Sequence, residues 1–153
     1  MTNKIALDTS FVLGLLDRQD LWHERAEQLK TQLAAYGWQP VVFDCVISEA
    51  ISTIAHRTHE RRRGAETGEL LSRLRNEFPA HSIVWVYPDL PRLYESVVDL
   101  VEGSSGALNF NDALIALSCR NRKIIYLASF DSDFDQVAWL KRIAESGNLA
   151  GQG

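Results

Sequence analysis

A helical pattern, a short apolar run and an acidic loop follow one another without a break between residues 109 and 135. Residues 110–120 have the apolar spacing of an amphipathic helix, with Asp112 in its first turn. Residues 123–128 are short and rich in apolar and β-branched side chains, which is typical of a buried parallel strand. The loop behind that strand carries Asp131, Asp133 and Asp135. Because ligands of an open parallel sheet bind beyond the carboxyl ends of its strands, the segment predicts a parallel sheet with acids at that edge.

The remainder of the chain alternates between strand and helix patterns. Strands are expected at residues 5–7, 40–43, 81–87, 123–128 and, as a short edge strand, 137–140. Helices are expected at residues 11–16, 21–36, 45–57, 69–78, 90–101 and 110–120, with residues 64–68 as a loose connection. Gly37 is expected to end the second of these helices, and Asp44 can cap the third. This alternation predicts an α/β fold of three layers, with a parallel sheet of about five strands flanked by helices. We expect one domain over residues 1–143 and a flexible, glycine-rich tail over residues 144–153.

Composition supports a soluble, cytoplasmic protein. The chain has 153 residues, of which 46% are hydrophobic and 24% charged, as in ordinary globular domains. No apolar run approaches the roughly 20 residues of a membrane span, and the N-terminus leads into a strand pattern, unlike a signal peptide. Cys45 and Cys119 lie in apolar patterns and are expected to be buried thiols. The net charge of −4 argues against a generally basic nucleic-acid-binding surface, but it does not exclude a nuclease.

Acidic residues occur where several of these elements begin or end. The set comprises Asp8, Glu49, Asp112, Asp131 and Asp133. Each has a structural alternative: Asp8, Thr9 or Ser10 could be an N-cap, and an early glutamate suits the helix dipole. Four or five carboxylates at one sheet edge would nevertheless repel one another, and such clusters commonly hold Mg²⁺ or Mn²⁺.

A hard cation among carboxylates suits phosphodiester hydrolysis, because the ion activates water and stabilises charge on the phosphate. Thr9 or Ser10 could orient Asp8 or a metal-bound water. The sequence contains no phosphate-binding loop, no dinucleotide-binding loop, no zinc-ligand spacing and no serine nucleophile elbow. The acids therefore carry the chemistry that this sequence indicates.

A basic run, R-T-H-E-R-R-R, covers residues 57–63. Its arginines, Arg57, Arg61, Arg62 and Arg63, could contact RNA phosphates or an acidic partner. They could equally form a solvated helix end, since short basic runs are weak motifs. Both interpretations stay open at this point.

The acidic segments resemble the PIN-domain family. The likeness is carried by I-A-L-D-T-S-F-V-L-G-L-L-D, V-I-S-E-A-I-S-T-I-A-H-R, N-F-N-D-A-L-I-A-L-S and Y-L-A-S-F-D-S-D-F, in that order. In length and layout the chain is similar to VapC-type toxins of type II toxin–antitoxin systems. The resemblance implies that Asp8, Glu49, Asp112 and Asp131 match the family's acidic quartet, with Asp133 as a further member.

The same resemblance implies an endoribonuclease that needs Mg²⁺ or Mn²⁺, often dimerises and is neutralised by a small antitoxin protein. Ser129 stands where the family usually has threonine, which keeps the hydroxyl group. Residues 58–79 look longer and more basic than in the shortest members. Leu13, Leu16 and the helix over residues 22–33 are candidate contributors to a dimer surface.

Two other functions remain as alternatives. One is a PIN-domain nuclease that matures or degrades RNA without an antitoxin. The other is a non-catalytic α/β binding module in which the acids are helix caps and solvated loop residues.

Overall fold

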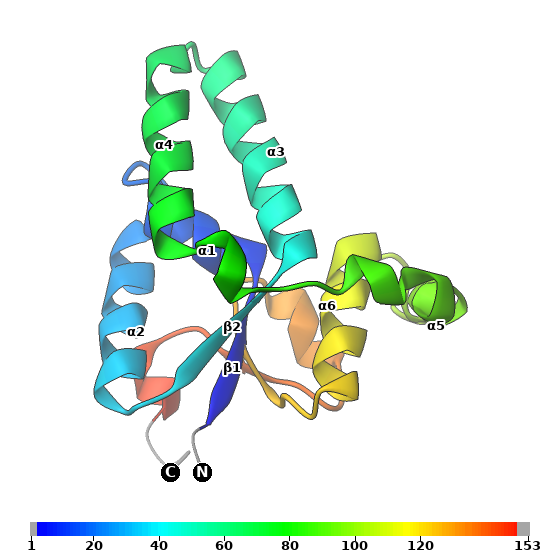
Figure 1. The fold of residues 1–153 in the computed structure, drawn as a ribbon. Helices are drawn as coiled ribbons and strands as arrows, with labels where there is room; N and C mark the ends of the chain where they lie inside the picture. The colour runs from blue at the N-terminus through cyan, green and yellow to red at the C-terminus, as the bar shows by residue number, and fades with distance from the viewer. Residues whose placement is uncertain (1–2, 150–153) are drawn as a thin grey trace.

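The computed structural model describes residues 3–149, which form one parallel sheet with helices on both sides (Figure 1). Five strands pair in the order β3-β2-β1-β4-β5, and every pairing is parallel. The strands are β1 (Lys4–Leu7), β2 (Gln39–Phe43), β3 (Ile83–Val84), β4 (Tyr126–Ala128) and β5 (Lys141–Ile143). The prediction of a three-layer α/β fold with a five-stranded parallel sheet is confirmed.

Six α-helices surround the sheet in the described part of the chain. They are α1 (Thr9–Leu16), α2 (His23–Ala35), α3 (Asp44–Glu60), α4 (Gly64–Glu77), α5 (Leu90–Gly103) and α6 (Phe110–Asn121). In Figure 1, α2 lies on one side of β1 and β2 and α6 on the other, while α3 and α4 project beyond the sheet as a hairpin. No helix within residues 3–149 combines the length and apolar character needed to cross a bilayer.

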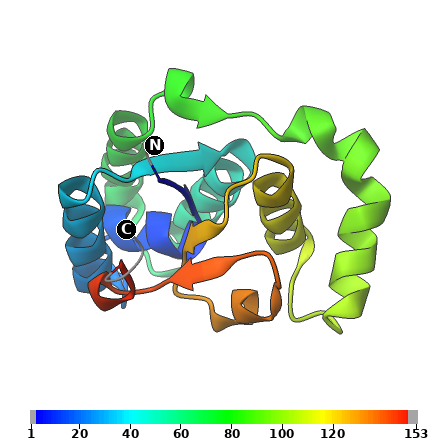
Figure 2. The ribbon, with the colours of Figure 1, turned by 90° about the horizontal axis from the view of Figure 1, so that it is seen from below.

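The strand order fixes where a ligand site can form. From β1 the chain builds outward through β2 to β3, and it then returns to place β4 on the other side of β1. The connections therefore diverge between β1 and β4, and an open α/β sheet commonly has its ligand-binding crevice at such a point, beyond the carboxyl ends of the strands. Figure 2 shows the same arrangement from below, with α5 and α6 away from α2. Strand β1 is buried at the centre, with Ile5 and Ala6 fully inaccessible to solvent.

Strand β3 is shorter than the predicted 81–87 because a buried acid captures the backbone that follows it. Asp44 Oδ1 accepts hydrogen bonds from the N–H groups of Cys45 and Val86, both at 2.9 Å. Its Oδ2 accepts from Tyr87 N at 3.0 Å. Asp44 is thus not the N-cap of α3, which is Phe43. It bridges β2 to the segment after β3, and it turns that segment away from the sheet ladder.

Two further strand predictions were misplaced because turns bury apolar side chains as well as strands do. Lys123 has a φ of 57°, and Ile124 N donates to Cys119 O at 2.9 Å to close the end of α6, so β4 begins only at Tyr126. Residues 137–140 form a turn in which Leu140 N donates to Val137 O at 3.1 Å. The edge strand is β5, directly after that turn.

The helix boundaries differ at two places as well. Residues 64–68 are not a loose connection, because α4 already begins at Gly64 and Glu66 in its first turn pairs with Arg63 at 2.7 Å. Residues 144–149, which were expected to belong to a flexible tail, include the 3₁₀ turn Ser146–Leu149, and Leu149 is buried. The rest of that predicted tail, residues 150–153, lies outside the described residues. The prediction that Gly37 ends α2 is confirmed by its φ of 71°.

Replacing Asp44 with alanine should destabilise the fold strongly. The change leaves the buried N–H of Val86 and its neighbours without an acceptor, and each such group costs about 1–3 kcal/mol. Urea unfolding should therefore show a loss of roughly 2–4 kcal/mol for Asp44→Ala. Ser48→Ala, at an exposed site on the same helix, should stay within about 0.5 kcal/mol of the wild type. Equal stability of both variants would mean that Asp44 does not hold this segment.

Candidate active site

Asp8 follows β1 at the N-cap position of α1, but its side chain makes no capping hydrogen bond. Its Oδ2 instead accepts hydrogen bonds from Ser129 Oγ at 2.7 Å and Ser10 Oγ at 2.8 Å. The side chain is only 4% exposed, and this burial raises the pKa of Asp8, which the hydroxyl donors and the Thr9 backbone lower in part. Asp8 therefore occupies the N-cap position without capping α1 through its side chain, and its carboxylate is held by the two serines instead.

The two serines tie the ends of β1 and β4 together. Ser10 Oγ accepts from Phe130 N, and Ser129 Oγ accepts from Asp131 N, each at 3.0 Å. Each hydroxyl therefore gives its one proton to Asp8 and receives a backbone N–H in return. Because both protons are used, the 3.4 Å approach of the two Oγ atoms adds no further hydrogen bond. This arrangement fixes Asp8 against the loop that begins with Ser129.

Glu49 lies half-buried on α3 and joins three helices at the site. Its Oε2 accepts from Thr9 Oγ1 of α1 at 3.2 Å and from Asn111 Nδ2 of α6 at 3.3 Å. Its charge also contributes to raising the pKa of Asp8, so the two carboxylates are close enough to repel each other. Thr9 thus orients Glu49, whereas the sequence suggested that it would act on Asp8 or a water.

Asp112 belongs to a capping box at the start of α6. Asn109 Oδ1 accepts from Asp112 N at 2.9 Å, and Asp112 Oδ2 accepts from Asn109 N at 3.0 Å. Burial raises the pKa of Asp112 to about 6, and the charges of Asp8, Asp131 and Glu49 add to the increase. The residue is therefore both a structural cap and a member of a repelling acidic group.

The acids after β4 occupy different environments. Asp131 is half-buried, and its Oδ1 accepts from Asp133 N at 2.9 Å. Asp133 is exposed, and its charge is not among those that raise the pKa of Asp8 or Asp112. Asp135 pairs with Arg142 at 2.8 Å, which lowers the pKa of that carboxyl group. Asp131 is thus grouped with Asp112, whose pKa its charge helps to raise, and Asp133 contributes its backbone N–H.

The basic run divides into paired and unpaired arginines. Arg57 pairs with Asp20 at 2.7 Å, and Arg63 pairs with Asp17 at 3.0 Å and with Glu66. These contacts pin the α3–α4 hairpin to the chain after α1. Arg61 and Arg62 are exposed between the two helices, and neither has a side-chain partner within the described residues.

Two asparagines, Asn109 and Asn111, complete the site and were not predicted from the sequence. Asn109 stands three residues before Asp112, and this spacing is a recognisable capping-box signal. Asn111 donates a hydrogen bond to Glu49, but its position next to Asp112 is the only feature of the sequence that points to a role in the site. Contacts of this kind depend on where α3 meets α6, which no local pattern encodes.

The donor set fits a hard divalent cation. Three of the four grouped acids are Glu49, Asp112 and Asp131. In each of them one carboxylate oxygen accepts a hydrogen bond from the protein, and the other oxygen has no hydrogen-bond partner among residues 3–149. Within the same residues, no three Asp, Glu, His or Cys side chains lie close enough to enclose an ion by themselves. A cation such as Mg²⁺ keeps several waters and needs only one or two direct carboxylates, so this spacing suits it.

Comparison with known proteins agrees with this geometry. The sequence model of the PIN domain family matches residues 5–140. Among solved structures, the chain is similar to VapC20 of Mycobacterium tuberculosis, with a TM-score of 0.66 and 22% sequence identity. The alignment covers 88% of this chain and 95% of VapC20, and at this identity it supports the fold. Among curated proteins, no sequence matches this chain.

Replacing Asp112 with asparagine should stabilise the metal-free protein at neutral pH. Folding raises the pKa of this carboxyl group from its usual 3.8 to about 6, so the ionised side chain opposes folding above pH 6. Asparagine removes the charge and keeps an oxygen that can accept from Asn109 N. With EDTA present, the melting temperature of Asp112→Asn should exceed that of the wild type at pH 7.5. The difference should shrink as the pH falls through 6 towards 4, because the wild type then takes up the proton.

Asp135→Asn is the matched control, since Arg142 lowers the pKa of Asp135. This variant should be no more stable than the wild type at pH 7.5. If Asp112→Asn behaved like Asp135→Asn, neither burial nor the neighbouring carboxylates would oppose the ionised form of Asp112 in the folded protein.

Proposed function

The chain belongs to the PIN domain family, and on that premise we propose that it is a divalent-metal-dependent endoribonuclease that hydrolyses RNA phosphodiester bonds. The observation that carries this proposal is the coupled charge of Asp8, Glu49, Asp112 and Asp131 in the crevice between β1 and β4. A group of like charges at a ligand-binding edge opposes folding and is explained by a positive ligand.

The proposed catalytic and metal-binding residues are these four acids, with Mg²⁺ or Mn²⁺ as the ion. Once bound, the cation would activate water and stabilise charge on the phosphate. The chain itself supplies the positions: Ser10 and Ser129 hold Asp8, and Thr9 and Asn111 hold Glu49. Asp133 supports Asp131 through its backbone N–H, and its exposed carboxylate is a fifth candidate metal ligand.

We further propose that the chain acts as the toxin of a toxin–antitoxin pair in the cytoplasm, with a small antitoxin protein as its partner. Support comes from the structural likeness to VapC20, which is described as a Sarcin-Ricin loop cleaving toxin. The likeness covers most of both chains, so the two proteins share their domain and not only a fragment of it.

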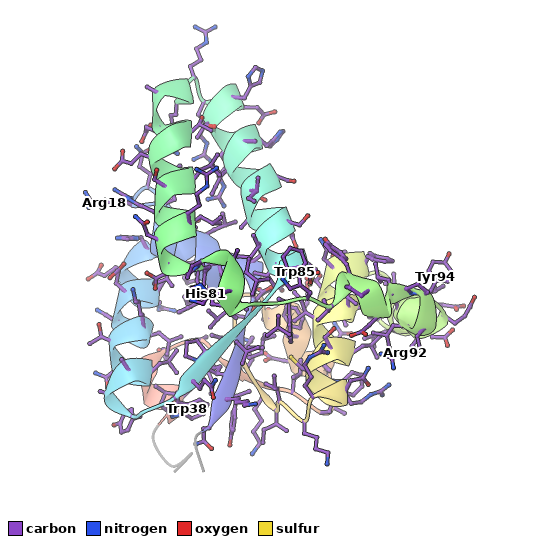
Figure 3. All side chains as sticks on the ribbon, in the orientation of Figure 1. Arg18, Trp38, His81, Trp85, Arg92 and Tyr94 are labelled. Atoms are coloured by element: carbon purple, nitrogen blue, oxygen red, sulfur yellow. The ribbon has the colours of Figure 1, made fainter. Side chains whose placement is uncertain are left out.

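The proposed homodimer would use a surface that differs in part from the one suggested by the sequence. Leu13 and Leu16 are buried within the protomer, as is the apolar face of α2, so these side chains are not free to form an interface, whereas the exposed face of α2 remains a candidate. Exposed apolar side chains instead occur at the base of α3 and beyond β3, where Ile51 is 41% and Trp85 59% exposed. Figure 3 labels Trp85 there and Tyr94 on α5. Such a surface suits burial against a second copy.

Cleavage of RNA by the wild type should require Mg²⁺ or Mn²⁺ and should stop with EDTA. Asp8→Asn and Asp112→Asn should each lower the rate by at least about 100-fold, because each removes charge that holds the cation. The measurement is gel analysis of a structured RNA after incubation with each protein. In parallel, Mn²⁺ at a hundredfold excess over its dissociation constant should stabilise the wild type by about 2.7 kcal/mol.

Asp135→Asn again serves as the control and should keep wild-type activity, since its partner is Arg142. A metal-independent activity, or full activity in Asp8→Asn and Asp112→Asn, would contradict the proposal. Absence of both cleavage and metal stabilisation would favour the non-catalytic binding module.

The exposed tip of the α3–α4 hairpin is the part of the basic run that we expect to contact RNA phosphates. Replacing Arg61 and Arg62 together with alanine should weaken RNA binding and reduce the salt dependence of the affinity by about 0.7 per lost phosphate contact. Fluorescence anisotropy at several salt concentrations measures both quantities. Lys4→Ala, at the amino end of the central strand β1, should change neither the affinity nor its salt dependence. Unchanged binding in the double variant would mean that Arg61 and Arg62 are solvated and do not contact RNA.

A further inference from the structure

Phe110 exposes an aromatic ring at the start of α6 without a structural reason. Its side chain is 42% exposed, whereas residues 113–119 of the same helix are buried. Within the described residues, no aromatic stacking or cation–π contact involves this ring. The residue that commonly packs a helix start is the one before the N-cap, and Leu108 fills that place fully buried. Phe110 is therefore not needed to anchor the helix.

The backbone places Phe110 directly before two residues that belong to the acidic site. The next residue, Asn111, donates to Glu49, and the one after it, Asp112, is coupled to Asp8 and Asp131. In an α-helix each Cα–Cβ bond tilts towards the N-terminus. The N-terminal end of α6 is the end that meets the acids, so the Cα–Cβ bond of Phe110 points towards that end of the helix.

The first turn of α6 is also held firmly. The reciprocal hydrogen bonds of Asn109 and Asp112 fix the backbone on both sides of Phe110. A ring on a fixed backbone loses little freedom when a flat ligand stacks on it. An uncharged contact has a further advantage here, because the carboxylates repel the phosphates of an approaching RNA.

We propose that Phe110 is the stacking surface for a nucleobase beside the scissile phosphate of single-stranded or looped RNA. This inference rests on the proposed ribonuclease function. Stacking of a base on an aromatic side chain contributes about 1–3 kcal/mol, which corresponds to about 5- to 150-fold in affinity. Any base offers such a face, so the contact selects an unpaired nucleotide and not a particular sequence.

The test compares Phe110→Ala, Phe110→Leu and Phe110→Tyr in Mn²⁺-dependent cleavage of a short single-stranded RNA. The value of kcat/KM should fall by about 5- to 150-fold for alanine and leucine and stay near the wild type for tyrosine. Ile125→Ala, an equally exposed apolar residue at the start of the neighbouring strand β4, should have no effect. Equal melting temperatures would exclude unfolding as the cause.

A second substrate identifies the contact. Removing the base next to the cleavage site should reduce the kcat/KM of the wild type to the level of Phe110→Ala. The same removal should not lower the kcat/KM of Phe110→Ala any further. Equal rates for alanine and tyrosine variants on both substrates would overturn the stacking role while leaving the nuclease standing. So would a Phe110→Ala protein with unchanged kcat/KM and an altered oligomeric state, because the ring would then contact protein.

Binding of the same RNA, measured without cleavage, separates the two proposals if the wild type cuts nothing. A 5-fold or greater loss of affinity in Phe110→Ala would support stacking even though the nuclease assignment had failed. RNA binding that is absent or unaffected by the substitution would overturn the stacking role as well.

Discussion

Repulsion among the carboxylates at the end of β1 is the constraint around which the surrounding structure is arranged. The direct hydrogen-bond donors to the four grouped acids are neutral: Ser10, Ser129, Thr9, Asn111 and the backbone N–H groups of Thr9, Asn109 and Asp133. Neutral donors orient a carboxylate without cancelling its charge. Elsewhere the same chain pairs acids directly with arginine, as in Asp17 with Arg63, whereas Arg142 is coupled to Asp131 by charge and makes its salt bridge with Asp135.

Asp8 and Asp44 show that position after a strand does not decide the role of an acid. Both follow a buried strand and stand at the start of a helix. The oxygens of Asp44 are filled by backbone N–H groups of its own helix start and of residues 86 and 87, so its charge serves the fold. The main partners of Asp8 are serine hydroxyls at the crevice between β1 and β4, and other carboxylates face it there. The difference lies in which distant segment reaches each carboxylate.

The contrast between Asp8 and Asp44 also explains why some features of the structure could be predicted from the sequence and others could not. Alternating strand and helix patterns were enough for the parallel sheet, and the order of acidic segments was enough to group Asp8, Glu49, Asp112 and Asp131. The strand boundaries failed where tertiary contacts override local preference: Asp44 ends β3 early, and the turn over residues 137–140 buries Val137 and Leu140 as a strand would. Asn111 was missed for the same reason, since its role exists only where α6 meets α3.

The two ends of α3 impose a length on any RNA that uses both. Glu49 lies in the second turn of α3, and Arg61 follows twelve residues later at its far end. At 1.5 Å per residue, the two positions are roughly 18 Å apart along the helix axis. Phosphates along a strand of B-form DNA advance by about 3.4 Å per nucleotide, and on that scale a strand contacting both positions would span on the order of five nucleotides. Arginine contacts to phosphates carry no sequence information. A hairpin tip at this distance would therefore favour an RNA by its shape, and the crevice between β1 and β4 would determine which of its phosphodiester bonds reaches the acids.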